Sequence, residues 1–349
     1  MRKDNVKVAI WGFGAMGSGM AEMLLTKKGV DIVGVCDRHD SRVGKSMFEV
    51  LGVERGDRAD VIINADIEKV VYPGAADVCL CATDSFTAKA FPRLKYVLEQ
   101  KINVVSTAEQ MAYPQAQEPE LAKQLDEIAK ANGVTILGTG INPGLIMDLL
   151  VVALTGCMTN LEHVEAKRVN SLSPFGHTVM EEQGVGISME TFDAGVKDGT
   201  LAGHVGFEES IAMIADAVGW EVDKVETQMK PIQTDVDRKS PHGFAAAGSV
   251  AGVNMTGQGF VGGQPIIDMI HPQQIEPEQV GVNTGDYIVL KGSPEVNMAI
   301  TPEVEGGLGT IAMCVNMIPQ VINADPGLVT MLDLPVPRAI QGDMRDRIK

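Results

Sequence analysis

A hydrophobic strand that leads directly into a glycine-rich turn and then into a helix constrains this chain more than any other feature. The pattern Gly12-x-Gly14-x-x-Gly17 follows the apolar run Val6–Trp11, and helical periodicity begins at Ala15. In such a turn the first glycine allows a tight bend, the second lets the backbone approach a pyrophosphate, and the third lets the helix pack close to the strand. The N–H groups at the start of the helix can then bind the anion. The motif therefore predicts a βαβ dinucleotide-binding unit.

The end of the following strand carries an acid where a pyridine nucleotide needs one. Asp37 lies 20 residues beyond Gly17, and a carboxylate there accepts hydrogen bonds from the ribose hydroxyls of NAD. Arg38 and Arg42 could pair with the extra phosphate of NADP, or they could belong to an exposed, solvated helix start. We therefore expect NAD and/or NADP as the cofactor. The expected cofactor-binding residues are Gly12, Phe13, Gly14, Ala15, Met16, Gly17, Asp37, Arg38, Ala82, Thr83 and Thr107.

Strand and helix patterns alternate from Val6 to about residue 156, which is typical of a parallel sheet covered by helices. The predicted strands are Val6–Trp11, Asp31–Cys36, Asp60–Ile63, Asp77–Ala82, Asn103–Ser106 and Val134–Leu137. The predicted helices with recognisable ends are Ala15–Lys28, Arg42–Leu51 and Pro119–Asn132. Six strands joined by crossovers predict an α/β fold with an N-terminal Rossmann-type, doubly wound parallel sheet.

The alternation is lost beyond Gly156, which indicates a second, α+β domain. Its predicted elements are strands near His163–Ser171, Val225–Asp235 and Tyr287–Leu290, glycine-rich stretches over Phe244–Gly263, and a helix over Gly206–Val218. The tail from Gly306 to Ala324 has a helical pattern. We expect residues 1–156 to form the dinucleotide-binding domain and residues 157–305 a substrate-binding and oligomerisation domain. We expect residues 306–349 to form a C-terminal helix and tail that pack on both.

Charge and composition exclude several classes of protein. The chain has 29 Lys and Arg residues against 46 Asp and Glu residues, a formal net charge of −17, which repels the phosphate backbone of nucleic acids. The five cysteines have no disulfide or zinc spacing and the six histidines form no cluster, so we expect no metal. We also expect no export signal and no membrane span, because no apolar run is long enough. The sequence predicts a cytoplasmic protein that binds neither nucleic acid nor membrane.

Two acids follow neighbouring strands of the predicted sheet. Asp84 comes directly after Cys79–Thr83, and Glu109 comes directly after Val105–Ala108. Ligands of open α/β sheets lie beyond the carboxyl ends of the strands, so we expect both carboxylates beside the nicotinamide end of the cofactor. Carboxylates placed there can bind a substrate ammonium group and accept its proton as the amine becomes a hydride donor. We expect Asp84 and Glu109 to be catalytic; the alternative for Asp84 is a cap on the following helix.

A Gly-Thr-Gly-x-Asn-Pro-Gly turn over residues 138–144 ends the sixth predicted strand and opens a predicted helix over Leu145–Thr155. Asn142 and Pro143 suit a turn and the start of a helix. The glycines of this turn would let the backbone approach a ligand closely. A turn that crosses between two domains is the alternative, and the two interpretations are compatible.

These motifs together resemble a known group of enzymes. The order of Trp11–Gly17, Ala82–Asp84, Glu109 and Gly138–Gly144 is similar to that in the amino-acid dehydrogenases related to meso-diaminopimelate dehydrogenase and dihydrodipicolinate reductase. Within that group the whole chain resembles the 2,4-diaminopentanoate dehydrogenases of amino-acid-fermenting bacteria. The resemblance implies reversible, NAD(P)-dependent oxidative deamination of 2,4-diaminopentanoate to 2-amino-4-oxopentanoate and ammonia. It also implies that Asp84 meets the reacting centre, whereas Glu109 stands where the diaminopimelate enzymes have Asp.

Two other functions stay open at the level of the sequence. One is another amino-acid dehydrogenase of the same group, acting on diaminopimelate, homoserine or saccharopine. The other is a non-catalytic, NAD(P)-binding redox sensor. The basic loop of dihydrodipicolinate reductases has no counterpart between Arg168 and His177, which argues against reduction of a cyclic imine. The presence of the acids Asp84 and Glu109 favours an enzyme over a non-catalytic sensor.

A diamino acid carries two ammonium groups and one carboxylate, so its site needs carboxylates and at least one positive or N–H-rich anchor. The candidates for that anchor are Arg168, His204 with the helix start at Gly206, and the polar run Asn170–Ser173. The expected substrate-binding residues are Thr83, Asn142, Arg168, Ser171 and His204. A homodimer is the default assembly for this architecture.

Overall fold

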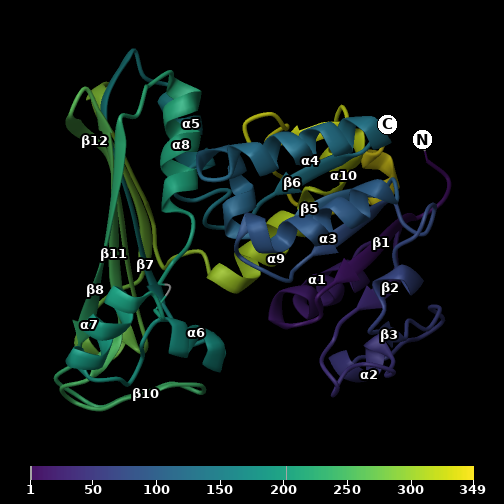
Figure 1. Ribbon diagram of the computed structural model, residues 1–349, viewed down its shortest axis with the longest axis horizontal. Helices are drawn as coiled ribbons and strands as arrows, with labels where there is room; N and C mark the ends of the chain where they lie inside the picture. Colours follow the sequence, from purple (N-terminus) through teal and green to yellow (C-terminus); the bar gives the residue numbers. More distant parts are fainter. Residues whose placement is uncertain (1, 202) are drawn as a thin grey trace. The chain divides into compact units, whose positions relative to one another are not determined.

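The structure, a computed structural model, describes residues 2–201 and 203–349. The chain forms two compact units: unit 1 contains residues 1–144 and 307–349, and unit 2 contains residues 145–306. Figure 1 follows the chain by colour, and the purple-to-blue and yellow segments together build unit 1, whereas teal and green segments build unit 2. Both ends of the chain therefore belong to the same unit.

Unit 1 is built on one parallel sheet of seven strands. Its strands are β1 (Val6–Trp11), β2 (Val30–Cys36), β3 (Ile63–Asn64), β4 (Val78–Cys81), β5 (Asn103–Ser106), β6 (Thr135–Gly138) and β15 (Gly327–Val329). They lie in the order β15-β6-β5-β4-β1-β2-β3, and every neighbouring pair is parallel. The chain winds outward from β1 in both directions, so the predicted doubly wound, Rossmann-type sheet is confirmed.

Helices cover both faces of this sheet, because right-handed crossovers on opposite sides of β1 place their helices on opposite faces. The helices of unit 1 are α1 (Ala15–Leu25), α2 (Met47–Leu51), α3 (Thr87–Glu99), α4 (Pro119–Asn132), α9 (Gly306–Asn316) and α10 (Ile318–Asn323). α3 and α4 lie side by side along β5 and β6 (Figure 1). α1 packs against β1 and β2, and α10 packs against β5 and β6.

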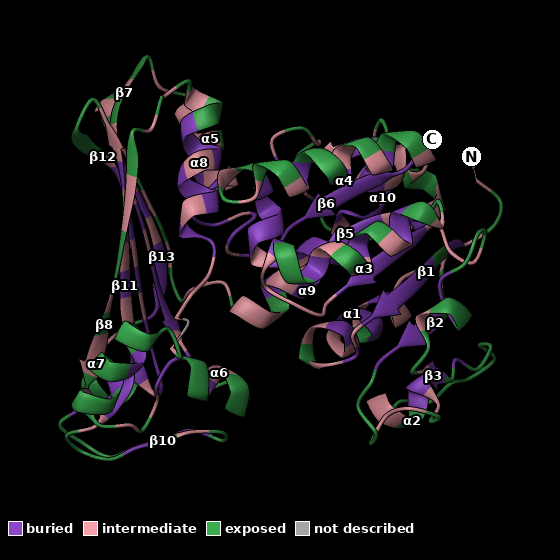
Figure 2. Cartoon of the chain, in the orientation of Figure 1, coloured by how far each residue is buried: buried purple, intermediate pink, exposed green. Residues whose placement is uncertain are grey.

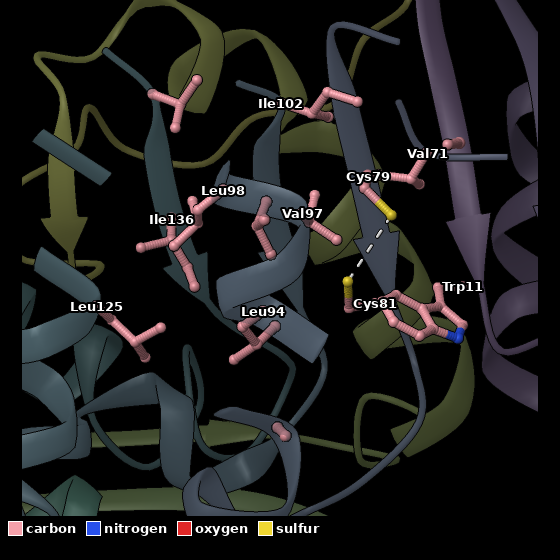
Figure 3. Packing of buried hydrophobic residues seen from close by; sticks show 14 of the residues in the cluster. Trp11, Val71, Cys79, Cys81, Leu94, Val97, Leu98, Ile102, Leu125 and Ile136 are labelled. Carbon is pink, nitrogen blue, oxygen red and sulfur yellow. Dashed lines mark hydrogen bonds between the residues drawn. The ribbon is translucent and has the colours of Figure 1, made fainter. Parts of the chain in front are cut away.

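One hydrophobic core of unit 1 includes residues of β4 and α3. Every residue of β4 is buried, as expected for a strand in a parallel sheet with both faces covered. Figure 3 shows Leu94, Val97 and Leu98 of α3 in the same cluster as Cys79 and Cys81 of β4. The two thiols are free and buried, with 3.8 Å between their Sγ atoms. They fill space as small apolar side chains.

The seventh strand of this sheet comes from the C-terminal tail and was not predicted from the sequence, which indicates six. β15 pairs with β6, and the Gly327 N–H donates to the Val134 carbonyl oxygen (3.0 Å). The tail then continues to the end of α1, where the Met344 N–H donates to the Lys28 carbonyl oxygen (2.9 Å). A three-residue strand is too short for an alternating pattern to reveal it.

The start of α2 also differs from the prediction. The sequence predicts a helix from Arg42, with Ser41 before it, but α2 begins at Met47. Ser46 is the residue that caps the helix, because its hydroxyl oxygen accepts a hydrogen bond from the Phe48 N–H (3.2 Å). Serine is a favoured N-cap residue at either position, and only the fold decides which of the two serines caps the helix.

Unit 2 is built on a mixed sheet of six strands in the order β14-β13-β7-β12-β11-β8. Its strands are β7 (Asn160–Ser171), β8 (Lys224–Gln233), β11 (Val250–Val261), β12 (Gln264–Gln274), β13 (Gly285–Ser293) and β14 (Val296–Ile300). β7 and β12 are parallel, and the other neighbouring pairs are antiparallel. The short strands β9 (Arg238–Lys239) and β10 (Phe244–Ala245) form a separate pair. The helices are α5 (Leu149–Thr155), α6 (His177–Glu182), α7 (Met189–Asp198) and α8 (Phe207–Val218). The predicted second, α+β architecture is confirmed.

The glycine-rich segment of unit 2 contains the long strand β11. A Cβ atom on Gly257 would lie 2.7 Å from the side chain of Phe207, and one on Gly259 would lie 2.7 Å from that of Ile211. Both contacts come from α8, which has a buried stripe (Figure 2). The glycines therefore let α8 lie directly on the sheet, rather than interrupting the strand.

Membrane-spanning helices and metal clusters are absent from residues 2–201 and 203–349. None of the described helices is both long enough and apolar enough to cross a bilayer. None of the described His, Cys, Asp and Glu side chains are grouped in threes that could hold a metal ion.

We expect Gly257→Ala to destabilise the protein, because the new methyl group would lie 2.7 Å from Phe207. Overpacking of this kind costs about 1–3 kcal/mol of the free energy of unfolding, which denaturant titration measures. Gly342→Ala is the control: no atom lies within 4 Å of its added Cβ, and a change below about 0.5 kcal/mol is expected. Equal stabilities of the two variants would contradict the close packing of α8 on β11.

Candidate functional site

The turn between β1 and α1 is packed so closely that side chains are excluded at two of its glycines. Gly12 has a φ of +93°, and a Cβ atom there would lie 2.3 Å from the Ala82 carbonyl oxygen. A Cβ atom on Gly17 would lie 1.8 Å from the Gly12 carbonyl oxygen. These two glycines are therefore required by the protein's own packing.

Gly14 is different, because the protein itself leaves the space beside it open. In the described part of the chain, no atom outside its two neighbours and the backbone of α1 lies within 4 Å of a Cβ atom built on Gly14. Gly14 is also the N-cap of α1, and no side chain caps the helix there. Among the described residues, the start of α1 thus combines open space with an N-cap that has no side chain to bond the first N–H groups of the helix, which is what a pyrophosphate needs. The residues present fit a dinucleotide.

Asp37 at the end of β2 ties the glycine turn to its neighbours. Its carboxylate accepts hydrogen bonds from the Phe13 N–H (2.6 Å) and the His39 N–H (2.7 Å), and the Arg42 guanidinium lies 3.3 Å away. Burial raises the pKa of Asp37, but the hydrogen bonds from His39 and Phe13 and the charge of Arg42 outweigh it and hold the pKa below its usual value. Asp37 is therefore an ionised acceptor. Arg38, by contrast, is exposed.

The other residues expected to bind the cofactor lie at the same edge of the sheet. Phe13 is buried, Ala15 is exposed and Met16 is half-buried at the start of α1. The Ala82 N–H donates to the Trp11 carbonyl oxygen (2.8 Å), which places Ala82 and the following Thr83 beside the glycine turn. The Thr107 N–H donates to the Cys81 carbonyl oxygen (3.0 Å). The structure brings these positions together at the carboxyl ends of β1, β4 and β5.

Asp84 forms an ion pair with Arg93 of α3, and both side chains are half-buried. The alternative interpretation of Asp84 as a helix cap is wrong, because the N-cap of α3 is Phe86 and the Asp84 carboxylate is paired with Arg93 instead. Arg93 is a residue that the sequence did not point to. It lies nine positions downstream, in a helix where an arginine is ordinary.

Glu109 is the first residue of the short 3₁₀ helix η2 (Glu109–Ala112) and is half-buried. Its backbone is held on both sides. Two residues before it, Thr107 is bonded to β4, and one residue after it the Gln110 N–H donates to the Ser85 carbonyl oxygen (3.1 Å). Glu109 and Asp84 therefore follow adjacent strands of one sheet, as the sequence predicts.

The turn over residues 138–144 packs against α9. The Ile141 N–H donates to the Thr310 hydroxyl (3.2 Å), and the Cys314 thiol donates to the Thr139 carbonyl oxygen (3.6 Å). Asn142 lies within this turn, before Pro143. The first segment of unit 1 ends at residue 144 and unit 2 begins at residue 145, so the chain first leaves unit 1 at this turn.

A buried ion pair dominates the polar interior of unit 2. Arg168 of β7 and Asp286 of β13 lie opposite one another, with 2.5 Å between Nη1 and Oδ1, and their side chains are 2% and 0% exposed. The Arg168 Nη2 also donates to the Val304 carbonyl oxygen (2.5 Å), and the Val304 N–H donates to Asp286 (2.9 Å). The three residues form a closed ring that compensates the buried charges.

Two histidines lie close to this ion pair. The rings of His204 and His271 are 4.7 Å apart in an edge-to-face arrangement, and the His271 Nε2 lies 3.0 Å from the Asn170 Oδ1. Burial, with a smaller contribution from Arg168, lowers the pKa of His204 to about 4. Burial also lowers the pKa of His271, helped by His204 and Arg168. Both rings are therefore neutral at pH 7, so His204 offers hydrogen bonds and no charge. The sequence did not point to His271 or Asp286.

Ser171 lies at the end of β7. Its N–H donates to the Glu303 carboxylate (3.3 Å), and its hydroxyl oxygen accepts from the Ser173 N–H (3.2 Å). Ser171 thus helps to hold the segment before α9 against β7.

Comparison with known proteins gives matches over both parts of the chain. Residues 145–349 match the family described as the 2,4-diaminopentanoate dehydrogenase C-terminal domain, and residues 6–136 match the N-terminal domain of dihydrodipicolinate reductase. A 2,4-diaminopentanoate dehydrogenase of Acetoanaerobium sticklandii is 64% identical over 346 residues, covering 99% of this chain and 98% of that protein.

Amine dehydrogenases are similar at lower identity. One from Streptomyces virginiae is 24% identical over 366 residues, covering 96% of this chain and 98% of its own. The solved structure of an amine dehydrogenase from Mycobacterium smegmatis has a TM-score of 0.86 and 26% identity, with 97% of this chain and 98% of that chain covered.

We expect Gly14→Ala to weaken binding of NAD⁺ or NADP⁺ while leaving stability unchanged. The methyl group would meet no protein atom within 4 Å, so it would occupy space that the pyrophosphate needs. Titration of the nucleotide followed by calorimetry measures the affinity, and thermal unfolding of the free protein measures stability. Unchanged affinity would argue against the dinucleotide site.

Acid should destabilise the protein partly through His204. Its pKa is about 4 in the folded state against 6.5 for the unperturbed group. Between these two pH values the unfolded chain therefore binds more protons than the folded protein. Stability from the neutral ring is therefore lost as the pH falls from 6.5 toward 4, by at most about 1.4 kcal/mol per pH unit. Denaturant titrations at pH 7 and pH 5 should show a smaller loss for His204→Gln than for the parent; equal losses would contradict the assignment.

Proposed function

Because the chain belongs to the 2,4-diaminopentanoate dehydrogenase family, we propose that it catalyses the oxidative deamination of 2,4-diaminopentanoate with NAD⁺ or NADP⁺. The substrate loses its C4 amine, and water replaces it, which gives 2-amino-4-oxopentanoate, ammonium, the reduced nucleotide and one proton. The observation that carries the proposal is the 64% identity to the Acetoanaerobium sticklandii enzyme over 99% of the chain. The uncapped start of α1 beside Gly14 supports the cofactor.

Glu109 is the residue best placed to take the proton from the C4 ammonium group. It follows β5 at the carboxyl edge of the sheet, next to the strand whose end meets the glycine turn. The amine must be neutral before its carbon can give up a hydride, because the nitrogen lone pair drives that step. NAD(P)⁺, when bound, supplies the acceptor for the hydride. As water adds at C4 and the amine leaves, the protonated Glu109 can return its proton to the departing nitrogen, and the proton that the water loses is the one released.

Asp84 has a different role in this proposal. Its carboxylate forms an ion pair with Arg93, which fixes its position against α3. A carboxylate held in this way is suited to bind and orient an ammonium group, together with the neighbouring Thr83. We therefore assign the orientation of the amine to Asp84, and we assign the proton transfer to Glu109 from its place after β5 at the same edge of the sheet.

The amino-acid end of the substrate needs a partner for its carboxylate, and unit 2 offers three candidates. Arg168 is fixed by Asp286 and Val304, but a guanidinium has five N–H donors and two contacts leave others to give. His204 is neutral and can donate one hydrogen bond. Ser171 carries a hydroxyl group at the end of β7. In unit 1, Asn142 of the turn over residues 138–144 is the further candidate.

The organisation and setting of the enzyme are part of the same proposal. Unit 1 binds the cofactor, unit 2 contributes the amino-acid anchors and the contacts between subunits, and the assembly is a homodimer. The described cysteines are free, although Cys79 and Cys81 lie close together, which is consistent with a reducing cytoplasm.

Purified protein should reduce NAD⁺ or NADP⁺ in the presence of 2,4-diaminopentanoate and release ammonium in equal amount. Nucleotide absorbance, an ammonium assay and mass spectrometry of 2-amino-4-oxopentanoate measure the three products. Diaminopimelate, homoserine and saccharopine are the comparison substrates. Faster turnover of any of these would replace the proposed substrate, and no turnover with any amine would favour a sensor.

Glu109→Gln should lower kcat by about 10²–10⁴-fold, because it removes the proton acceptor. Asp84→Asn should have a smaller effect on kcat and should mainly raise the KM for the diamino acid. The affinity for NAD⁺ should stay unchanged in both. Glu99→Gln is the matched control, since Glu99 is an exposed acid of α3 near Lys95. A larger loss of kcat in Asp84→Asn than in Glu109→Gln would reverse the two roles.

A further inference from the structure

Gln110 makes the link between the two loops that carry Asp84 and Glu109. It is 8% exposed and follows Glu109 directly on η2. Its main-chain N–H donates to the Ser85 carbonyl oxygen (3.1 Å), and its side-chain Oε1 accepts a hydrogen bond from the Thr87 N–H (2.9 Å). One residue therefore holds the neighbouring loop on both sides of Phe86.

The side-chain contact replaces a helix cap. Thr87 is the first residue of α3, and its N-cap, Phe86, has no oxygen in its side chain to accept a hydrogen bond. Thr87 is fully buried, so water cannot satisfy its N–H group. A buried donor without a partner is costly. Gln110 supplies the acceptor from another segment, and the start of α3 thereby depends on the position of η2.

The same link sets the positions of the two acids. Glu109 lies between two fixed points, the Thr107 N–H on the Cys81 carbonyl oxygen and the Gln110 N–H on the Ser85 carbonyl oxygen. Asp84 is the residue before Ser85 and is paired with Arg93 of the helix that Gln110 caps. Loss of the Gln110 side-chain contact would free the start of α3, and with it the loop between β4 and α3.

We infer that Gln110 is a positioning residue that fixes the Asp84 loop relative to Glu109 through the hydrogen bond between its Oε1 and the Thr87 N–H. It touches neither substrate nor cofactor in this role. The inference deepens the proposed function and rests on it, because the geometry of the two acids matters for the deamination. A misplacement of about 1 Å can cost roughly 10²-fold in rate.

Three variants distinguish the effect of losing the Gln110–Thr87 hydrogen bond from the effect of changing the size of the side chain. Gln110→Met keeps the length and removes the acceptor, whereas Gln110→Glu keeps an acceptor that the N-terminus of α3 favours. Thr87→Pro removes the donor instead, at a first helical position where proline is well tolerated. Thr87→Val is the matched control: it keeps the N–H and removes a hydroxyl that has no partner among the described residues.

Kinetics with 2,4-diaminopentanoate and NAD⁺ test the inference in the full-length protein. Gln110→Met and Thr87→Pro should each lower kcat by about 10–100-fold, with an unchanged KM for NAD⁺. The double variant should be no worse than either single one, because both remove the same bond. Gln110→Glu and Thr87→Val should stay close to the parent. Additive losses in the double variant, or equal losses in Gln110→Met and Gln110→Glu, would overturn the inference.

Hydrogen exchange of the Thr87 amide tests the hydrogen bond between Gln110 and Thr87 independently of enzyme activity. Exchange should be slow in the parent and in Gln110→Glu, and fast in Gln110→Met. The same rate in all three would overturn the inference even if the enzyme is active. If the parent does not oxidise 2,4-diaminopentanoate, the proposed function fails, while the exchange pattern still decides whether Gln110 holds the loop.

Discussion

The backbone of the turn between β1 and α1 lies so close to its neighbours that it fixes the positions of the strand ends around it. Gly12 rests against Ala82 at the end of β4, and Gly17 rests against Gly12. Asp37 binds the N–H of Phe13 from the end of β2. Three strand ends are therefore held together by main-chain contacts and one ionised carboxylate. The start of α1 faces open space as a consequence, and the acids after β4 and β5 take their places from the same contacts.

Features that lie within a short stretch of sequence could be predicted. The turn from Gly12 to Gly17 and the acid at Asp37 belong to one βαβ unit. Only glycine satisfies the steric requirements of the turn, so the residue type alone reveals it. Asp84 and Glu109 were found for a related reason, because parallel strands bring their carboxyl ends to one edge. The elements of the parallel sheet were predicted well where helices have clear caps, as at Pro119–Asn132.

Features that depend on contacts distant in sequence could not be predicted. The partner of Asp84 is an arginine on the face of α3, and the cap of α3 comes from Gln110, outside the helix. Asp286 lies opposite Arg168 only because β13 pairs with β7 in one particular register. The sequence shows a glycine-rich stretch over Phe244–Gly263 but no strand there, and Gly257 and Gly259 are needed because α8 packs on top of β11. Each case is a tertiary contact without a local pattern.

The pairing of β15 with β6 has a consequence for the order in which the protein is built. The Thr135 hydroxyl donates to the Asp325 carbonyl oxygen across 190 positions of sequence, and all of unit 2 lies between them. Closing so long a loop is slow, and chains emerge from the ribosome from the N-terminus onward. Unit 2 is one continuous segment, so it can fold before residues 327–329 are available to pair with β6 at the edge of the first sheet. The seventh strand of the nucleotide-binding sheet therefore cannot pair until residues 327–329 have been synthesised, although the first strand of that sheet is synthesised first.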